Sequence, residues 1–181
     1  MANSKAEGSR AGSPWRIIGW SLAGLVLLIP LVAMQFTKEV QWTVGDFMFA
    51  ALLIGLVGTA FELAVRASAN GTYRGGAAAA LAASFLTVWV NGAVGMIGNE
   101  DNSYNLLFLG VILVALAGSI LARFRPRGMS LTMFTAAGLQ AALGVAGMAT
   151  DVRGGIFATL FAGLWLLAAA LLRQASLEDQ A

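Results

Sequence analysis

Residues 106–122 read LLFLGVILVALAGSILA, a run of 17 residues without a charged side chain. A stretch this long is close to the ~20 residues with which an α-helix crosses about 30 Å of hydrocarbon. It is apolar throughout, whereas strands of transmembrane barrels alternate between apolar and polar residues. Backbone groups in lipid must find their hydrogen-bond partners within the segment itself, so the sequence predicts a membrane-spanning helix here.

Five more apolar segments of similar length lie on either side of this one. We expect them to cross the membrane at residues 16–36, 47–65, 76–97, 131–149 and 156–172. The composition agrees, because 59% of the 181 residues are hydrophobic and 11% are charged, whereas about 25% of the residues in soluble domains are charged. The predicted fold is all-α, a six-helix transmembrane bundle over residues 15–173, with a disordered tail at 1–14 and a short tail at 174–181.

The basic residues predict how the bundle is oriented. If the N-terminus lies in the cytoplasm, nine of the eleven Lys and Arg residues fall on the cytoplasmic side, and only Lys38 and Arg153 fall outside. Short cytoplasmic loops carry an excess of Lys and Arg, so this distribution predicts that both termini are cytoplasmic.

The residue types that are missing restrict the chemistry. The chain has no cysteine and no histidine, which removes disulfides, thiolate nucleophiles and the usual zinc sites. No phosphate-binding loop, nucleophile elbow or pair of carboxylates on one helix is present. A net charge of +2 is too small to suggest nucleic-acid binding. We therefore expect a protein that is not an enzyme and that needs no cofactor and no metal.

Apart from Arg16, which begins the first predicted span, Glu62 is the only ionisable side chain inside a predicted span. It precedes Arg66 by four residues, the favourable order for an ion pair on a helix. One interpretation is a pair at the membrane interface, with the side chains reaching the headgroups. The other is that Glu62 faces the bundle and handles a proton or a cation, because intramembrane charges often mark transport pathways.

Two carboxamides, Asn91 and Gln140, lie well inside predicted spans. Asn91 belongs to a face of small and polar residues that also includes Ser84, Thr87 and Gly95, at the spacing of one side of a helix. Small residues let helices approach closely, and carboxamides form hydrogen bonds between helices. We favour this packing role for both residues over contact with a ligand. A similar small face in the second span contains Gly55 and Thr59.

Three motifs in the central part of the chain have a recognisable pattern: WVNGAVGMIGNEDN at 89–102, NLLF at 105–108 and ARFRPRG at 122–128. Together they resemble a group of small multi-pass bacterial inner-membrane proteins to which no activity is assigned. The resemblance extends from the second span to the fifth and implies a location in the bacterial plasma membrane. It assigns a functional role to no residue.

Two functional hypotheses follow. The first is a non-enzymatic accessory or structural membrane subunit that packs against a partner protein or against itself, because small-residue helix faces are abundant. The second is a small-solute or proton-linked transporter that uses Glu62, Asn91 and Gln140. In either case the lipid bilayer is the main partner, and we expect anionic lipid to contact the basic loop formed by Arg123, Arg125 and Arg127. The acidic loop at 99–102 is expected to be solvated.

Overall fold

The computed structural model describes residues 14–180, and all regular structure in that range is helical. Within these described residues, six helices are each long and apolar enough to cross a membrane. By helix length and hydropathy, the chain is a multi-pass membrane protein with an all-α fold. The helices are α1 (Pro14–Phe36), α2 (Val44–Ala67), α3 (Gly71–Ala93), α4 (Leu106–Leu121), α5 (Pro126–Gly147) and α6 (Val152–Glu178), with a 3-10 turn, η1 (Ser103–Asn105), before α4. Nearly all of the predicted tail at 1–14 lies outside the described residues.

Helices α2, α3, α5 and α6 begin three to five residues before the predicted spans, and two C-terminal helix ends differ from the prediction as well. The third span was expected to reach Ile97, but α3 ends at Ala93. Gly95 has a φ of +74°, a backbone conformation that breaks a right-handed helix and that glycine adopts at little cost. At the other end of the chain, α6 continues as a helix to Glu178, so most of the predicted tail at 174–181 is an extension of the last span.

The chain divides into two compact units, Met1–Thr59 and Ala60–Ala181. The described part of the first unit contains α1 and the first two thirds of α2. Its two helices meet at Gly58, where a Cβ atom would lie 3.0 Å from the ring of Trp20. The small face predicted in this span does not make that contact, because nothing lies within 4 Å of a Cβ at Gly55 and Thr59 is exposed. The glycine one turn further along makes it instead.

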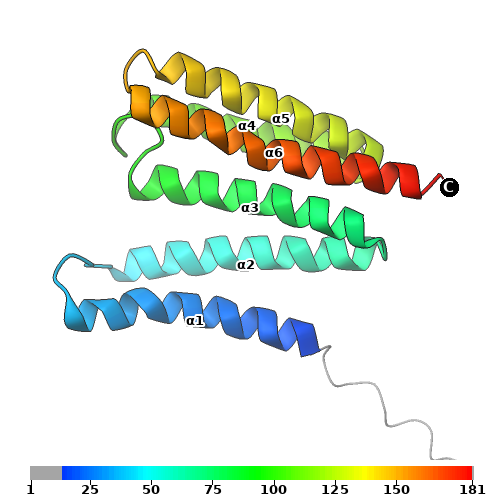
Figure 1. Ribbon diagram of the computed structural model, residues 1–181. Coiled ribbons are helices and arrows are strands. Elements are labelled where there is room, and N and C mark those ends of the chain that lie inside the picture. Colours follow the sequence, from blue (N-terminus) through cyan, green and yellow to red (C-terminus); the bar gives the residue numbers. More distant parts are fainter. Residues whose placement is uncertain (1–13, 181) are drawn as a thin grey trace, which may run out of the picture. The chain divides into compact units, whose positions relative to one another are not determined.

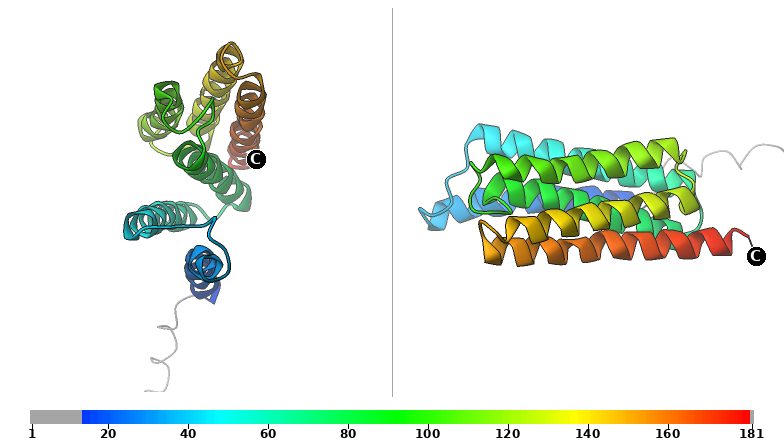
Figure 2. Two further views of the ribbon diagram at one scale, coloured as in Figure 1. Left: turned by 90° about the vertical axis from the view of Figure 1, so that its left-hand side faces the viewer. Right: turned by 90° about the horizontal axis from the view of Figure 1, so that it is seen from above.

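The second unit contains a bundle of α3, α4, α5 and α6 (Figures 1 and 2). Here α5 packs most extensively on α6, while α3 packs on α6 and α4 on α5. Glycines allow this close approach. A Cβ atom at Gly144 would lie 2.6 Å from the backbone nitrogen of Thr159, and one at Gly76 would lie 2.7 Å from the side chain of Leu172.

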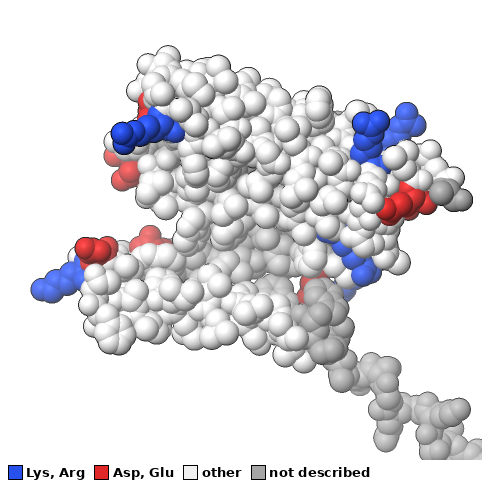
Figure 3. Space-filling view, viewed as in Figure 1, with Lys and Arg blue, Asp and Glu red and all other residues white. Residues whose placement is uncertain are grey.

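Small and aromatic residues fill the core of this unit. Trp165 and Leu172 are completely buried among alanines of the neighbouring helices, and the burial of Trp165 agrees with the packing role expected for an intramembrane tryptophan. A smaller apolar cluster lies toward the loop after α3 and consists of Met96, Ile97, Phe108 and Ala158. The visible surface of this unit is uncharged between two charged ends (Figure 3), as expected of a bundle that crosses lipid.

Candidate functional site

The predicted ion pair between Glu62 and Arg66 is present in α2. A guanidinium nitrogen of Arg66 lies 3.3 Å from a carboxylate oxygen of Glu62. The Arg66 side chain is 65% exposed and that of Glu62 is 13% exposed, so the arginine is largely accessible while the glutamate is mostly covered. This geometry agrees with the interfacial interpretation of Glu62.

Gln140 lies at the centre of the second unit and is completely buried. Its side-chain nitrogen donates a hydrogen bond to the carbonyl oxygen of Ala158 on α6, at 3.1 Å, and lies 3.9 Å from the sulfur of Met96. The bond crosses from α5 to α6, as the packing interpretation predicts. Gln140 therefore connects two helices and the loop that follows a third.

Asn91 does not make the hydrogen bond between helices that the sequence suggested. Its side-chain nitrogen donates to the carbonyl oxygen of Thr87, at 2.7 Å, within α3 itself. The reason is local, because a short polar side chain can reach the carbonyl four residues earlier on the same helix. Asn91 and Gln140 thus do not form one polar site by direct contact.

Among the described residues, four buried side-chain atoms have no hydrogen-bond partner. They are the hydroxyl oxygen of Thr87, the carboxamide oxygens of Asn91 and Gln140, and the indole nitrogen of Trp165. Such atoms are uncommon in folded proteins and need an explanation. Thr87 lies on α3 between residues of the two apolar clusters, and Gln140 lies on α5 among residues of the larger cluster, so both place polar atoms inside the apolar core.

The loop between α3 and η1 is built around Asn105, which the sequence analysis did not single out. The side-chain oxygen of Asn105 accepts from the backbone nitrogen of Ile97 at 2.9 Å, and its nitrogen donates to the carbonyl oxygen of Asn99 at 2.7 Å. The residue is 5% exposed. These bonds turn the chain so that Met96 and Ile97 enter the core.

Asp151 fixes this loop to the start of α6. Its carboxylate accepts hydrogen bonds from the backbone nitrogens of Gly154 and Gly98, both at 3.0 Å. The first bond caps the helix, and the second holds a loop more than fifty residues earlier in the chain. The Gly154 bond and then the Gly98 bond lower the pKa of Asp151 below its ordinary value, because both stabilise the carboxylate form.

Two tyrosines that lie near the ends of predicted spans use their hydroxyls to hold the bundle together. Tyr73 is buried and donates to the carbonyl oxygen of Phe124, at 3.2 Å, in the turn between α4 and α5. Tyr104 donates to the carbonyl oxygen of Leu143, on α5, at 2.8 Å. The sequence showed only that both lie near span ends, and it gave no sign of these partners.

The opposite end of the second unit is closed by hydrogen bonds between α3 and the end of α6. The Glu178 carboxylate accepts from Asn70 and from Thr72, each at 3.1 Å. It therefore lies at the N-terminus of α3, where the helix dipole favours a negative charge. Nearby, the guanidinium of Arg74 donates to the carbonyl oxygens of Val65 and Ser68 at the end of α2.

The two charged loops singled out in the sequence are exposed. Arg123, Arg125 and Arg127 lie at the surface of the α4–α5 turn, and Glu100 and Asp101 lie at the surface of the loop before η1. The exposure of these carboxylates agrees with the prediction of a solvated loop. No group of three or more potential metal-ligating side chains occurs in the part of the chain that the structure describes.

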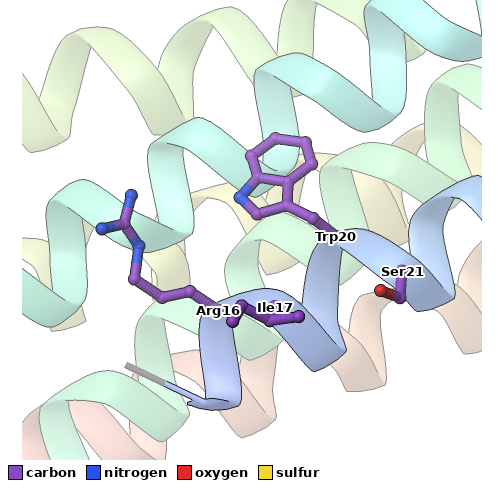
Figure 4. Close-up of a pocket in the computed structure, with 4 residues that line it drawn as sticks. All are labelled: Arg16, Ile17, Trp20 and Ser21. Atoms are coloured by element: carbon purple, nitrogen blue, oxygen red, sulfur yellow. The ribbon is translucent and has the colours of Figure 1, made fainter. Parts of the chain in front are cut away.

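The first unit has an open depression on α1, lined by Arg16, Ile17, Trp20 and Ser21 (Figure 4). Trp20 and Arg16 project to the same side of the helix, as residues four apart do. All four lining residues come from a single helix, and they offer no pair of groups suited to proton transfer or nucleophilic attack.

Comparisons of the chain with protein-family models, with curated proteins and with solved structures find no match. The resemblance to bacterial inner-membrane proteins therefore stays a prediction, and no family is assigned.

Proposed function

We propose that this chain is a non-enzymatic structural or accessory protein of the bacterial inner membrane, with both termini in the cytoplasm. Its role is to pack, through its helix faces, against a partner membrane protein or a second copy of itself. The observation that supports the proposal is that each of the three intramembrane polar candidates makes at least one bond within the chain, although the carboxamide oxygens of Asn91 and Gln140 have no hydrogen-bond partner among the described residues. Glu62 pairs with Arg66, Asn91 bonds to Thr87 and Gln140 bonds to Ala158.

The packing of the second unit supports the same conclusion. Where α5 meets α6, Gly155 approaches so closely that a Cβ atom there would lie 2.6 Å from the carbonyl oxygen of Gly144. Contacts this close leave no space for a solute between these two helices. By contrast, large apolar side chains on the outer faces, such as Leu113, Leu131 and Leu160, are more than 60% exposed and suit contact with lipid or with another membrane protein.

The experiment is purification of the full chain from bacterial membranes in a mild detergent, followed by identification of what remains bound. The proposal predicts one stoichiometric membrane-protein partner, or a defined oligomer of this chain, that withstands dilution. A monomer with no partner, in several mild detergents and after cross-linking in intact membranes, would contradict it.

One observation favours the alternative of a small-solute or proton-linked transporter. The side-chain oxygens of Thr87 and Gln140 are buried and unpaired, and buried polar atoms of this kind often meet water or a ligand. Proteoliposomes with an imposed pH gradient and a pH-sensitive dye test this alternative. A transporter would dissipate the gradient faster than protein-free vesicles, and Glu62→Gln and Gln140→Met would abolish the effect. The structural role predicts no difference.

Topology reporters test the proposed orientation. A cytoplasmic reporter fused after Ala181 should be active, and a periplasmic reporter fused at Asp101 should be active too. These expectations follow from the excess of basic residues on one side of the predicted spans. A periplasmic reporter that is active at the C-terminus would overturn the orientation.

A further inference from the structure

We propose that the turn between α4 and α5, together with Arg173 on α6, binds the phosphate groups of anionic lipids. The site consists of Arg123, Arg125, Arg127 and Arg173, with Phe124 between the first two arginines. The inference rests on the proposed membrane function but not on the identity of any protein partner.

The turn between α4 and α5 is very short. Only four residues, 122–125, separate the end of α4 at Leu121 from the start of α5 at Pro126. Both helices are apolar enough to cross a bilayer. A connection this short between two spans must lie at the membrane surface, which places its side chains at the depth of the lipid phosphates.

The backbone of the turn has an unusual conformation. Arg123 and Phe124 have φ values of +52° and +56°, in the left-handed region that glycine adopts readily and other residues adopt at a cost. Hydrogen bonds hold this conformation, from the backbone nitrogen of Phe124 to the oxygen of Ser119 and from Tyr73 to the oxygen of Phe124. Strained backbone of this kind concentrates at functional sites. Here the strained positions are occupied by Arg123 and by the half-exposed Phe124, although glycine would be less strained at both.

The register of α5 and α6 places Arg127 and Arg173 at the same end of the bundle. The hydroxyl of Ser130 donates to the carbonyl oxygen of Ala169 across these antiparallel helices. Arg127 lies three residues before Ser130 and Arg173 lies four residues after Ala169, so both lie about one turn beyond this bond, at the same end of the bundle. Both are exposed, as are Arg123 and Arg125. Within the described residues none of these four arginines forms an ion pair.

In the described part of the chain, the nearby carboxylates form no ion pair with these arginines and accept hydrogen bonds from neutral side chains instead. Glu178 and Asp179 both accept hydrogen bonds from Asn70, and Glu178 also accepts from Thr72 and Gln174. The exposed guanidinium groups are therefore available to form paired hydrogen bonds with phosphate oxygens. Phe124 would lie at the boundary between headgroups and acyl chains. This position favours a lipid phosphate over free phosphate as the ligand.

The test is native mass spectrometry of the purified full chain in neutral detergent, with phosphatidylglycerol or phosphatidylcholine added. The proposal predicts retention of phosphatidylglycerol in preference to phosphatidylcholine. Replacing Arg123, Arg125 and Arg127 together by Gln should weaken retention on the order of 100-fold, at roughly fivefold per basic residue near an anionic surface. The matched control is Arg153→Gln, which removes an exposed arginine from the opposite end of the same unit.

A second variant separates binding from folding. Arg123→Gly relieves the left-handed conformation, so the melting temperature should stay the same or rise while retention of phosphatidylglycerol falls roughly fivefold. Unchanged retention in this variant and in the triple variant would overturn the proposal. Equal loss with Arg153→Gln would overturn it too, because the effect would then follow net charge. If inorganic phosphate at the same concentration displaces the lipid, the site binds free phosphate and the assignment to lipid is wrong. None of these outcomes depends on whether a protein partner co-purifies.

Discussion

Helices α5 and α6 differ sharply from helices α1 and α2 in how much of their surface is buried by the rest of the chain. In the most apolar windows of α5 and α6, 33% and 39% of the residues are buried. In the corresponding windows of α1 and α2 the buried share is only 6%. Yet the exposed helices are on average the more apolar pair, with mean hydropathies of 2.3 for α1 and 2.1 for α2, against 1.4 for α5 and 2.2 for α6.

This difference shows that hydropathy and packing are separate properties in a membrane chain. Lipid tails are as apolar as leucine, so apolar side chains alone give helices little reason to associate. Helices α5 and α6 associate through glycine at their contacts and through the cross-helix bonds of Gln140 and Ser130. The contact between α1 and α2 has one close glycine, Gly58 against Trp20.

The largest expected effect comes from one substitution made in both regions. Gly144→Leu should destabilise the protein by about 3 kcal/mol, the upper end of the usual cost of overpacking, because its side chain would meet the backbone of Thr159. Gly24→Leu in α1, where nothing lies within 4 Å, should change stability by less than about 0.5 kcal/mol, as exposed substitutions do. Thermal unfolding in detergent measures both. Equal losses would show that the two regions are packed alike.

The next effect concerns the loop after α3. Gly95→Ala should cost about 1–3 kcal/mol, the range for a non-glycine residue held in a sparsely populated backbone region. The new Cβ atom would also meet the carbonyl of Asn99 and lie 2.7 Å from the Asn105 side chain. The control is Gly98→Ala, which has the same sign of φ but whose nearest atom is 3.4 Å away. The control carries the same backbone strain without the close contacts, so it should cost less than Gly95→Ala; equal losses would show that backbone strain rather than the contacts with Asn99 and Asn105 dominates this loop.

A smaller effect depends on pH. The lowered pKa of Asp151 means that its contribution to stability is present above the pKa of the unfolded chain and is lost as the pH falls through the folded value. The Gly98 amide should therefore stay held at about pH 4, where an ordinary aspartate becomes protonated, and should be released only at a lower pH, because the folded pKa of Asp151 lies below that value. Hydrogen exchange at Gly98 measures this release. In Asp151→Ala the exchange should already be fast at neutral pH, and protection that persists in this variant would contradict the assignment.

The smallest expected effect is at the ion pair of α2. Glu62→Gln should cost at most about 1 kcal/mol, because Arg66 is largely exposed and solvent screens the pair. Arg66→Gln should behave in the same way, and a double variant should show little coupling. Chemical denaturation of the three variants provides the comparison. A large loss for Glu62→Gln alone would indicate a second buried partner for the carboxylate.

The sequence predicted the six spans well because their length and hydropathy are local properties. It also identified the Glu62–Arg66 pair, which depends only on a spacing of four residues. It missed Asn105 and Asp151, whose partners lie in another part of the loop or fifty residues away. The end of α3 was placed four residues too late because Met96 and Ile97 are apolar, and apolarity alone does not distinguish a span from a loop that enters the core. The asparagines at 99, 102 and 105 after two glycines were the signal of a turn.

If the second unit is a closed structural bundle rather than a solute pathway, water does not reach its buried polar residues, and single cysteines can test this. The chain has no cysteine of its own, so Gln140→Cys and Thr87→Cys can each be probed with a membrane-impermeant maleimide, with Asp101→Cys as the exposed control. A closed bundle predicts that Asp101→Cys is labelled, while the cysteines at the two buried positions are labelled only after denaturation. Rapid labelling of Gln140→Cys or Thr87→Cys in intact, folded protein would show a water-filled path to the core and would contradict a closed bundle.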